Sequence, residues 1–202
     1  RDNDGKIIGE LEPVSSASAD PSVVSLAGSI DGIKPWPADT PKLYTVTVSL
    51  SVSGKQVDSV NVRTGFRTIS VEKGELHLNG KRIFLAGFNR HEDSVESGAA
   101  FDEGSMRRDL EMMKAAGANT VRLCHYPHHE LELDFCDELG LYALAEIPLY
   151  FWDDKEEGLA ENELRVSAAR RQLETMITRD RNHPSVILWS VSNETNEEHE
   201  EV

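Results

Sequence analysis

Residues 185–194, SVILWSVSNE, form an apolar run that ends on an amide beside a carboxylate, Asn193 and Glu194. A carboxylic acid placed directly after a buried strand can exchange a proton with a bound substrate. The chain has 36 acidic residues, most of which we expect to be solvated surface groups, so it is this position that sets Glu194 apart. The pattern indicates general acid–base chemistry, with Glu194 as the candidate proton donor.

Polar residues also follow three earlier apolar segments. They occur in 89–93 (NRHED), in 122–129 (RLCHYPHH) and at Glu146, just before 147–152 (IPLYFW). Because the C-terminal ends of parallel strands meet on one rim, we expect these groups to gather there. Arg122 at a strand end is typical of a residue that orients a carboxylate or a substrate, although it could simply pair with a neighbouring acid. Trp152 is a candidate stacking platform, although a tryptophan half-buried in the core is equally common.

The sequence evidence for a metal site or for disulfide bonds is weaker than the evidence for acid–base chemistry. Histidines 125, 128 and 129 have an HxxHH spacing, but they lie on a predicted loop without a cysteine or carboxylate in fixed register, so the zinc signature is weak. Two cysteines, Cys124 and Cys136, are too few for a disulfide framework, and we expect both to be reduced and structural.

The elements that must position these residues change character near residue 67. Residues 1–67 are rich in β-branched residues, serine and turn formers. Segment 43–52 alternates with period two, residues 53–55 (SGK) predict a turn, and 56–66 reads as the returning strand. This part of the chain predicts a β-sandwich portion.

Beyond residue 68, strand-like and helix-like segments alternate. An Asn79-Gly80 turn predicts a hairpin over 75–84. Apolar residues recur at helical spacing in each predicted helix, and Gly117 and Gly140 would end the first two. This βα rhythm predicts a parallel α/β sheet, and both a doubly wound sheet and half of a (β/α)8 barrel fit it. The predicted strands are 82–88, 120–123, 142–147 and 186–191, and the predicted helices are 105–116, 130–139 and 162–181.

The net charge and the hydropathy of the chain exclude some classes of binding partner. A net charge of −15 argues against nucleic acid and against an anionic membrane surface, and no apolar run approaches the ~18–20 residues that span a bilayer. The opening residues, RDNDGKIIGE, resemble neither a signal peptide nor a natural start. We therefore expect a piece of a longer protein, with its compartment open and the cytoplasm favoured.

Four motifs carry a family resemblance: GFNRHED, RRDLEMMKAAGANTVRLCHYPHH, DELGLYALAEIPL and RDRNHPSVILWSVSNE. In this order they closely resemble glycoside hydrolase family 2, which contains β-galactosidases, β-glucuronidases and β-mannosidases. The upstream segment WPADTPKLYTVTV resembles the end of the family's immunoglobulin-like sandwich. The resemblance spans about residues 36–194. It implies an immunoglobulin-like β-sandwich portion over 1–67 and the first half of a (β/α)8 TIM barrel over 68–202.

The resemblance also implies roles for the site residues. Glu194 matches the acid/base of a retaining glycosidase, whose two carboxyl groups lie ~5–5.5 Å apart. Asn193 matches the residue that binds the sugar 2-hydroxyl, and Arg122 matches the arginine that orients the nucleophile. His91 and His125 match histidines that line the sugar subsite. The family's nucleophile lies near strand seven, so we expect it beyond this chain and expect the isolated fragment to be inactive.

The chain departs from the family's metal-dependent β-galactosidases, which place a glutamate and a histidine shortly after strand three. The corresponding residues, 147–152, include neither. The sequence therefore implies no cofactor, and a magnesium site is doubtful even though Glu194 matches a residue of that site.

The sequence leaves three functions open, all with a carbohydrate partner. The resemblance implies hydrolysis of β-glycosides, with β-galactosides first and β-glucuronides as the rival within the family. A non-catalytic carbohydrate-binding relative is the alternative from another class, which the Asn193-Glu194 pair and Arg122 disfavour. The sequence does not decide whether the full-length protein forms a homo-oligomer.

Overall fold

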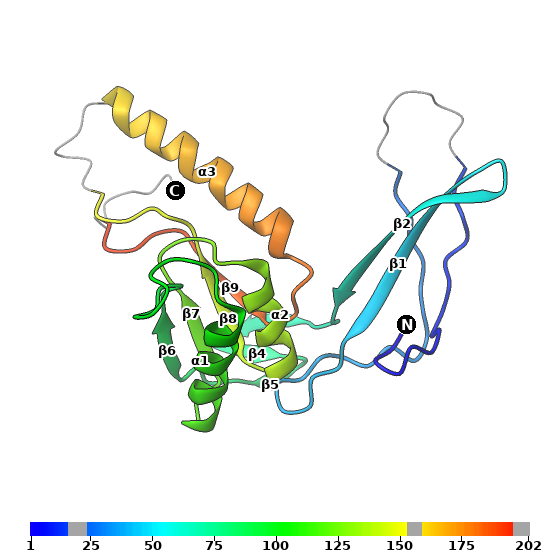
Figure 1. Cartoon of the computed structure of the whole chain (residues 1–202), viewed down its shortest axis with the longest axis horizontal. Helices are drawn as coiled ribbons and strands as arrows, with labels where there is room; N and C mark the ends of the chain where they lie inside the picture. The colour runs from blue at the N-terminus through cyan, green and yellow to red at the C-terminus, as the bar shows by residue number, and fades with distance from the viewer. Residues whose placement is uncertain (16–23, 153–158, 196–202) are drawn as a thin grey trace.

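The computed structural model describes residues 1–15, 24–152 and 159–195, which form three sheets and three helices (Figure 1). Among the described helices, none combines the length and the apolar character that crossing a lipid bilayer requires. The strands are β1 (Tyr44–Val52), β2 (Lys55–Thr64), β3 (Ile69–Glu72), β4 (Glu75–Leu78), β5 (Lys81–Arg82), β6 (Gly87–Arg90), β7 (Thr120–Leu123), β8 (Tyr142–Glu146) and β9 (Val186–Ser190). The helices are α1 (Glu103–Ala115), α2 (Glu130–Leu139) and α3 (Leu159–Asp180).

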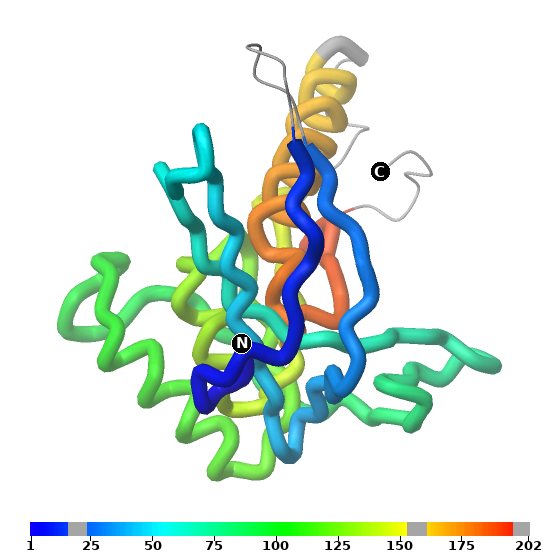
Figure 2. Tube along the Cα trace, turned by 90° about the vertical axis from the view of Figure 1, so that its right-hand side faces the viewer, coloured from blue at the N-terminus to red at the C-terminus, as the bar shows by residue number. Residues whose placement is uncertain are grey.

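The N-terminal region forms an arm that extends away from the helices (Figure 1). Its antiparallel pair β1–β2 is closed by Ser53 and Gly54, with φ of 51° and 77°, so the predicted hairpin is confirmed. Two extended segments run beside each other next to this hairpin, where Gly9 lies against Ile30 (Figure 2).

The small antiparallel sheet β3-β4-β5 follows the arm in the chain. Asn79 and Gly80 both have positive φ, at 51° and 75°, which confirms the predicted type I′ turn. The predicted continuous strand over 82–88 is wrong, because β5 ends in this antiparallel sheet and β6 begins in a different, parallel one. Between them, Ile83 and Leu85 pack against a buried cluster instead of extending a strand.

Strands β6, β7, β8 and β9 form one parallel sheet in chain order. The βα units therefore connect neighbouring strands, as the sequence predicts. Helices α1 and α2 pack against each other on one face of the sheet, and α3 extends beyond them (Figure 1).

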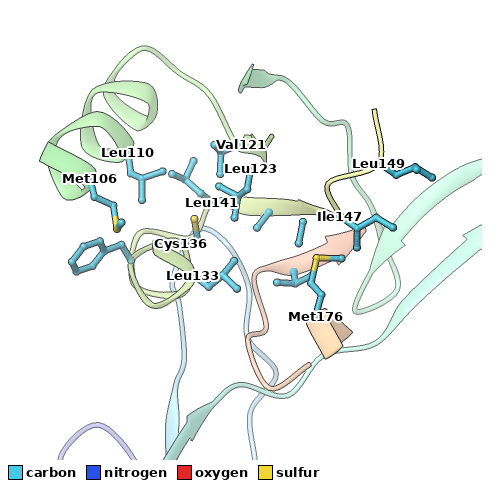
Figure 3. Packing of buried hydrophobic residues seen from close by; sticks show 14 of the residues in the cluster. Met106, Leu110, Val121, Leu123, Leu133, Cys136, Leu141, Ile147, Leu149 and Met176 are labelled. Carbon is cyan, nitrogen blue, oxygen red and sulfur yellow. The ribbon is translucent and has the colours of Figure 1, made fainter. Parts of the chain in front are cut away.

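Side-chain alternation along the strands divides the sheet into two faces. Val121 and Leu123 belong to the core under the helices, so Arg122 between them points to the opposite face. Ala145 of β8 likewise belongs to this core, which places Glu146 on the same face as Arg122. The alternation along β7 and β8 thus places charged side chains on the face away from the helices and apolar side chains on the face that the helices cover. Figure 3 shows this core, with Met106, Leu110, Val121, Leu123, Leu133, Cys136, Leu141, Ile147, Leu149 and Met176.

The ends of α1 and α2 have the expected capping chemistry. Asp102 accepts a hydrogen bond from Ser105 N at 3.2 Å at the start of α1. Gly117 and Gly140 have φ of 90° and 66° and follow the two helices, as predicted. A Cβ on Gly140 would lie 1.8 Å from the carbonyl oxygen of Ala38, so glycine is also required for contact with the N-terminal region.

A second buried cluster joins the N-terminal region to the parallel sheet, and we call it the seam: Trp36, Leu43, Leu78, Tyr142 and Ile187. The Trp36 side chain is fully buried, and its Nε1 donates a hydrogen bond to the carbonyl oxygen of Asp137 at 3.0 Å.

The side chain of Asp137 continues this connection into the segment before β9. Its Oδ1 accepts from Ser185 N at 2.9 Å, and its Oδ2 lies 2.8 Å from Nδ1 of His183. Hydrogen bonds of Asp137 therefore link the seam to the residues that precede β9.

His183 should make stability depend on pH. Burial lowers its pKa, but the hydrogen bond and charge of Asp137, with the charges of Asp134 and Asp180, outweigh burial and raise the pKa. A raised folded-state pKa gives stabilisation that is complete below the unfolded value of about 6.5 and is lost as pH rises through the folded value. We expect His183→Asn in the full-length protein to lower the thermal midpoint more at about pH 5.5 than at about pH 8.5. An equal loss at both pH values would contradict this.

Candidate active site

The centre of the candidate site is Glu146, a fully buried carboxylate at the end of β8. Its Oε2 accepts hydrogen bonds from Arg122 Nε at 2.9 Å, Arg122 Nη2 at 2.7 Å and Ser190 Oγ at 2.6 Å. Its Oε1 lies 2.6 Å from Nδ1 of His125, and because an ionised carboxylate only accepts hydrogen bonds, this nitrogen is the donor. Glu146 therefore connects the ends of β7 and β9 with the loop after β7.

These contacts also fix the charge of Glu146. Burial raises its pKa, but hydrogen bonds from Ser190, His125 and Arg122, together with the charge of Arg122, outweigh burial and lower the pKa. The carboxylate is thus ionised at neutral pH and balances the guanidinium. Sequence reasoning noted Glu146 at a strand end but gave it no role, although a glutamate inside the apolar run LYALAEIPL was the available signal.

Arg122 also reaches the end of β9. Its Nη2 donates to Oδ1 of Asn193 at 2.9 Å. The backbone of Asn193 is held by the segment after β8, because its N–H donates to Leu149 O at 2.8 Å and its carbonyl accepts from Phe151 N at 3.2 Å. The structure thus brings together Arg122, His125 and Asn193, and their roles toward a sugar stay predictions.

His91 lies beside this group, just after β6. Its ring makes an edge-to-face contact with His125, with ring centroids 5.2 Å apart. Its Nε2 lies 3.6 Å from Sγ of Cys124. His91 is exposed and His125 is partly exposed, so both imidazoles are open to solvent on the polar face of the sheet.

Glu194 follows Asn193 with an exposed side chain. Among the described residues, its carboxylate has no hydrogen-bond or ion-pair partner. Its φ is 51°, a left-handed conformation that costs a non-glycine residue about 1–3 kcal/mol and that clusters at functional sites. The acid/base role of Glu194 stays a prediction.

Trp152 lies apart from the other predicted site residues. Its side chain is 2% exposed and belongs to the core under the helices. Its Nε1 donates to Oδ1 of Asn162 on α3 at 3.0 Å. In this arrangement the indole offers almost no free face to a ligand, and its predicted stacking role stays a prediction.

The remaining histidines of the HxxHH pattern have protein partners. His128 is buried, with Nδ1 2.9 Å from Glu132 Oε2 and Nε2 3.1 Å from Cys124 O. His129 caps α2, where its Nδ1 accepts from Leu131 N at 3.2 Å. Both imidazoles therefore act as structural groups in this part of the chain.

Residues 147–152, which follow β8 in the described part of the chain, offer no side-chain ligand for a magnesium site of the kind that the resemblance implies. Magnesium requires oxygen ligands in octahedral geometry. Within 147–152, Ile147 and Leu149 are buried in the core, and the segment contains no carboxylate or imidazole.

Comparison with known proteins places these features in a family. A family model described as the TIM barrel domain of glycosyl hydrolases family 2 matches residues 69–201, and a second family 2 model matches residues 1–67. A β-galactosidase of Enterobacter cloacae is 38% identical over 169 residues, which cover 79% of this chain and 16% of that protein. A β-galactosidase of Arthrobacter is 35% identical over 189 residues, which cover 92% of this chain and 18% of that protein.

Solved structures agree with the sequence comparison. The β-glucuronidase from Ruminococcus gnavus in complex with uronic deoxynojirimycin is 34% identical, with a TM-score of 0.77 over 83% of this chain and 29% of that one. The chain thus spans less than a fifth of the two β-galactosidases, at 16% and 18%. The predicted fold, a sandwich domain followed by TIM-barrel βα units, is confirmed. The chain belongs to glycosyl hydrolase family 2.

Proposed function

We propose that the full-length protein is a retaining hydrolase of terminal β-glycosides, with β-galactosides as its preferred substrates and Glu194 as its acid/base. The observation that carries this proposal is the array of Arg122, His125 and Asn193 around buried Glu146, immediately before Glu194. Such an array holds polar groups in fixed orientations beside one exposed carboxylate, which is what positioned acid–base chemistry requires.

The asparagine is oriented for sugar binding. Because Arg122 donates to Oδ1 of Asn193, the side-chain NH2 of that asparagine is left as a donor. A donor at this position suits a sugar 2-hydroxyl, whose hydrogen bond strengthens in the oxocarbenium-like transition state. His91 and His125 add two more hydrogen-bonding groups beside it.

Glu194 would act in both halves of the reaction. In the first, its proton passes to the glycosidic oxygen as the bond from that oxygen to the anomeric carbon breaks and a nucleophilic carboxylate bonds to that carbon. In the second, Glu194 takes a proton from water, and the water oxygen displaces the nucleophile. The nucleophile is assigned to no residue of this chain.

Glu146 is unsuited to be that nucleophile. It is fully buried, and both of its oxygens accept hydrogen bonds. We assign it a positioning role, in which it holds Arg122 and His125.

A second candidate substrate is a β-glucuronide, which the likeness to the Ruminococcus gnavus β-glucuronidase favours. A uronate requires a cation that is free to bind it. The charge of Arg122 is already balanced by Glu146, and its Nε and Nη2 donate to Glu146 and Asn193, so it does not offer an unpaired cation. This contact favours a neutral sugar over a uronic acid at Arg122.

A panel of nitrophenyl glycosides tests the proposal on the full-length protein. We expect kcat/KM for the β-galactoside to exceed that for the β-glucuronide and for both α-anomers, and we expect NMR to show the β-anomer of the free sugar first. Treatment with EDTA should not lower the rate, because we propose no magnesium requirement. A preference for glucuronide would select the second candidate, and binding without hydrolysis of any glycoside would overturn the proposal.

A further inference from the structure

Three soft or borderline metal-binding groups meet beside the candidate site, and we call them the thiol–imidazole cluster: His91, Cys124 and His125. Their ligand atoms all lie within 4.8 Å of one another. They come from the loop after β6 and the loop after β7. The proposed hydrolysis gives Cys124 no task, so the cluster has a chemical capacity that the proposed function leaves unused.

The spacing of two of these atoms fits one tetrahedral ion. Cys124 Sγ and His91 Nε2 are 3.6 Å apart. Zinc binds sulfur at about 2.3 Å and imidazole nitrogen at about 2.0–2.1 Å, so two ligands at the tetrahedral angle lie about 3.6 Å apart. The cysteine and the first histidine therefore already have the separation that zinc requires.

The third group is oriented by its own carboxylate. Nδ1 of His125 donates to Glu146 Oε1 at 2.6 Å, which leaves Nε2 of this ring as the nitrogen with a free lone pair. A carboxylate behind a histidine is the usual support of a zinc-bound imidazole, because it fixes the tautomer and raises the basicity of the ligand. Glu146 is fully buried and held by Arg122 and Ser190, so this support is rigid.

Access suits a divalent cation, whereas burial raises the pKa of the Cys124 thiol, which donates to Arg90 O at 3.3 Å, so the metal must displace this proton. The positive charge of Arg122 is balanced by Glu146, so a thiolate at Cys124 would add net negative charge beside the ion. Cys124 is fully buried, whereas His91 is exposed and the His125 side chain is 25% exposed. An ion would therefore approach from the side of the two rings and reach the sulfur between them.

From this geometry we infer that the thiol–imidazole cluster is a zinc-binding site, with His91, Cys124 and His125 as protein ligands and water in the fourth position. Binding releases the thiol proton of Cys124 to solvent. Because His91 and His125 are the imidazoles assigned to the sugar, bound zinc competes with substrate and inhibits the enzyme. The inhibition depends on the proposed function, whereas the metal binding does not.

Cobalt(II) titration of the full-length protein tests the site without any substrate. We expect a thiolate-to-cobalt charge-transfer band together with the visible bands of tetrahedral cobalt, and we expect zinc to displace both. Cys124→Ser should abolish the charge-transfer band and weaken zinc binding at least about tenfold by calorimetry. Cys136→Ala is the matched control, because Cys136 is buried in the core and absent from the cluster, and it should keep the band.

A second variant separates loss of a ligand from loss of the fold, because a buried substitution such as Cys124→Ser could also destabilise the protein. His91 is exposed, so His91→Ala should keep the thermal midpoint while it also weakens cobalt binding. A wild-type protein without the charge-transfer band, or a band that persists in Cys124→Ser, would overturn the assignment.

Inhibition is then measured for each variant relative to its own metal-free rate. We expect zinc to raise the apparent KM of the wild type and of Cys136→Ala, with an inhibition constant at least about tenfold weaker in Cys124→Ser. Equal inhibition of all three proteins would overturn the inhibitory role. If the cobalt bands appear but no glycoside is hydrolysed, the proposed function fails while the zinc site stands.

Discussion

Glu194→Gln should suppress hydrolysis of β-glycosides with poor leaving groups by about 10²–10⁴-fold in the full-length protein. Glutamine keeps the shape of the side chain but has no proton to give to the glycosidic oxygen. An activated aryl glycoside needs little protonation of its leaving group, so the first step with such a substrate should be far less affected. This difference between substrates is the signature of a lost general acid.

The measurement compares kcat/KM for an alkyl glycoside and a dinitrophenyl glycoside. Glu111→Gln is the control, because Glu111 is an exposed acid on α1 that pairs with Arg107, and its substitution should leave both rates unchanged. An equal loss on both substrates in Glu194→Gln would count against the acid/base role, since that pattern indicates a general disturbance of the site.

Glu146→Gln should have the second large effect, on both rate and stability. The substitution removes the anion that faces Arg122 and places an NH2 group among the donors of Arg122, His125 and Ser190. Removing one partner of a buried ion pair costs about 3–5 kcal/mol, because the remaining charge is left uncompensated. Loss of the orientation of Arg122 and His125 should lower kcat by about 10²-fold.

Glu132→Gln is a matched control for this experiment. Glu132 is also fully buried and bonded to an arginine, Arg90, and to a histidine, His128. We expect it to lower the free energy of unfolding by a similar amount while kcat falls much less. If the two variants lose kcat in parallel with stability, Glu146 is only a structural residue. A selective fall in kcat at Glu146, with KM changed less, supports the positioning role.

Much of the fold could be predicted because local chemistry determines it. Asn79-Gly80 has the positive φ of a type I′ turn, and Gly140 ends α2 in the left-handed conformation. The continuous strand over 82–88 could not be corrected from the sequence, because Ile83 and Leu85 alternate as in a strand while they pack against the seam. A change from one sheet to another depends on contacts with residues distant in the chain, which a local pattern does not contain.

Some residues of the candidate site could likewise be predicted from the sequence, whereas others could not. Arg122 and Asn193 could be selected because they end apolar strands, and the structure joins them. The central place of Glu146 depends on partners from three elements, up to 44 residues away at Ser190. Trp152 shows the limit most clearly, because the sequence of its loop is the same whether the indole faces a ligand or contacts Asn162 of α3.

The contact between Trp36 and Asp137 has a consequence for protein engineering. The indole of the N-terminal region bonds to the last turns of α2, and the same aspartate holds the backbone that leads into the strand before Glu194. A chimera that exchanges residues 1–67 for another sandwich would thus alter the scaffold of the TIM-barrel domain as well as the exchanged part. Chimeras that retain Trp36 and its neighbours should fold and be active. Chimeras joined at residue 67, which lose Trp36, should be insoluble.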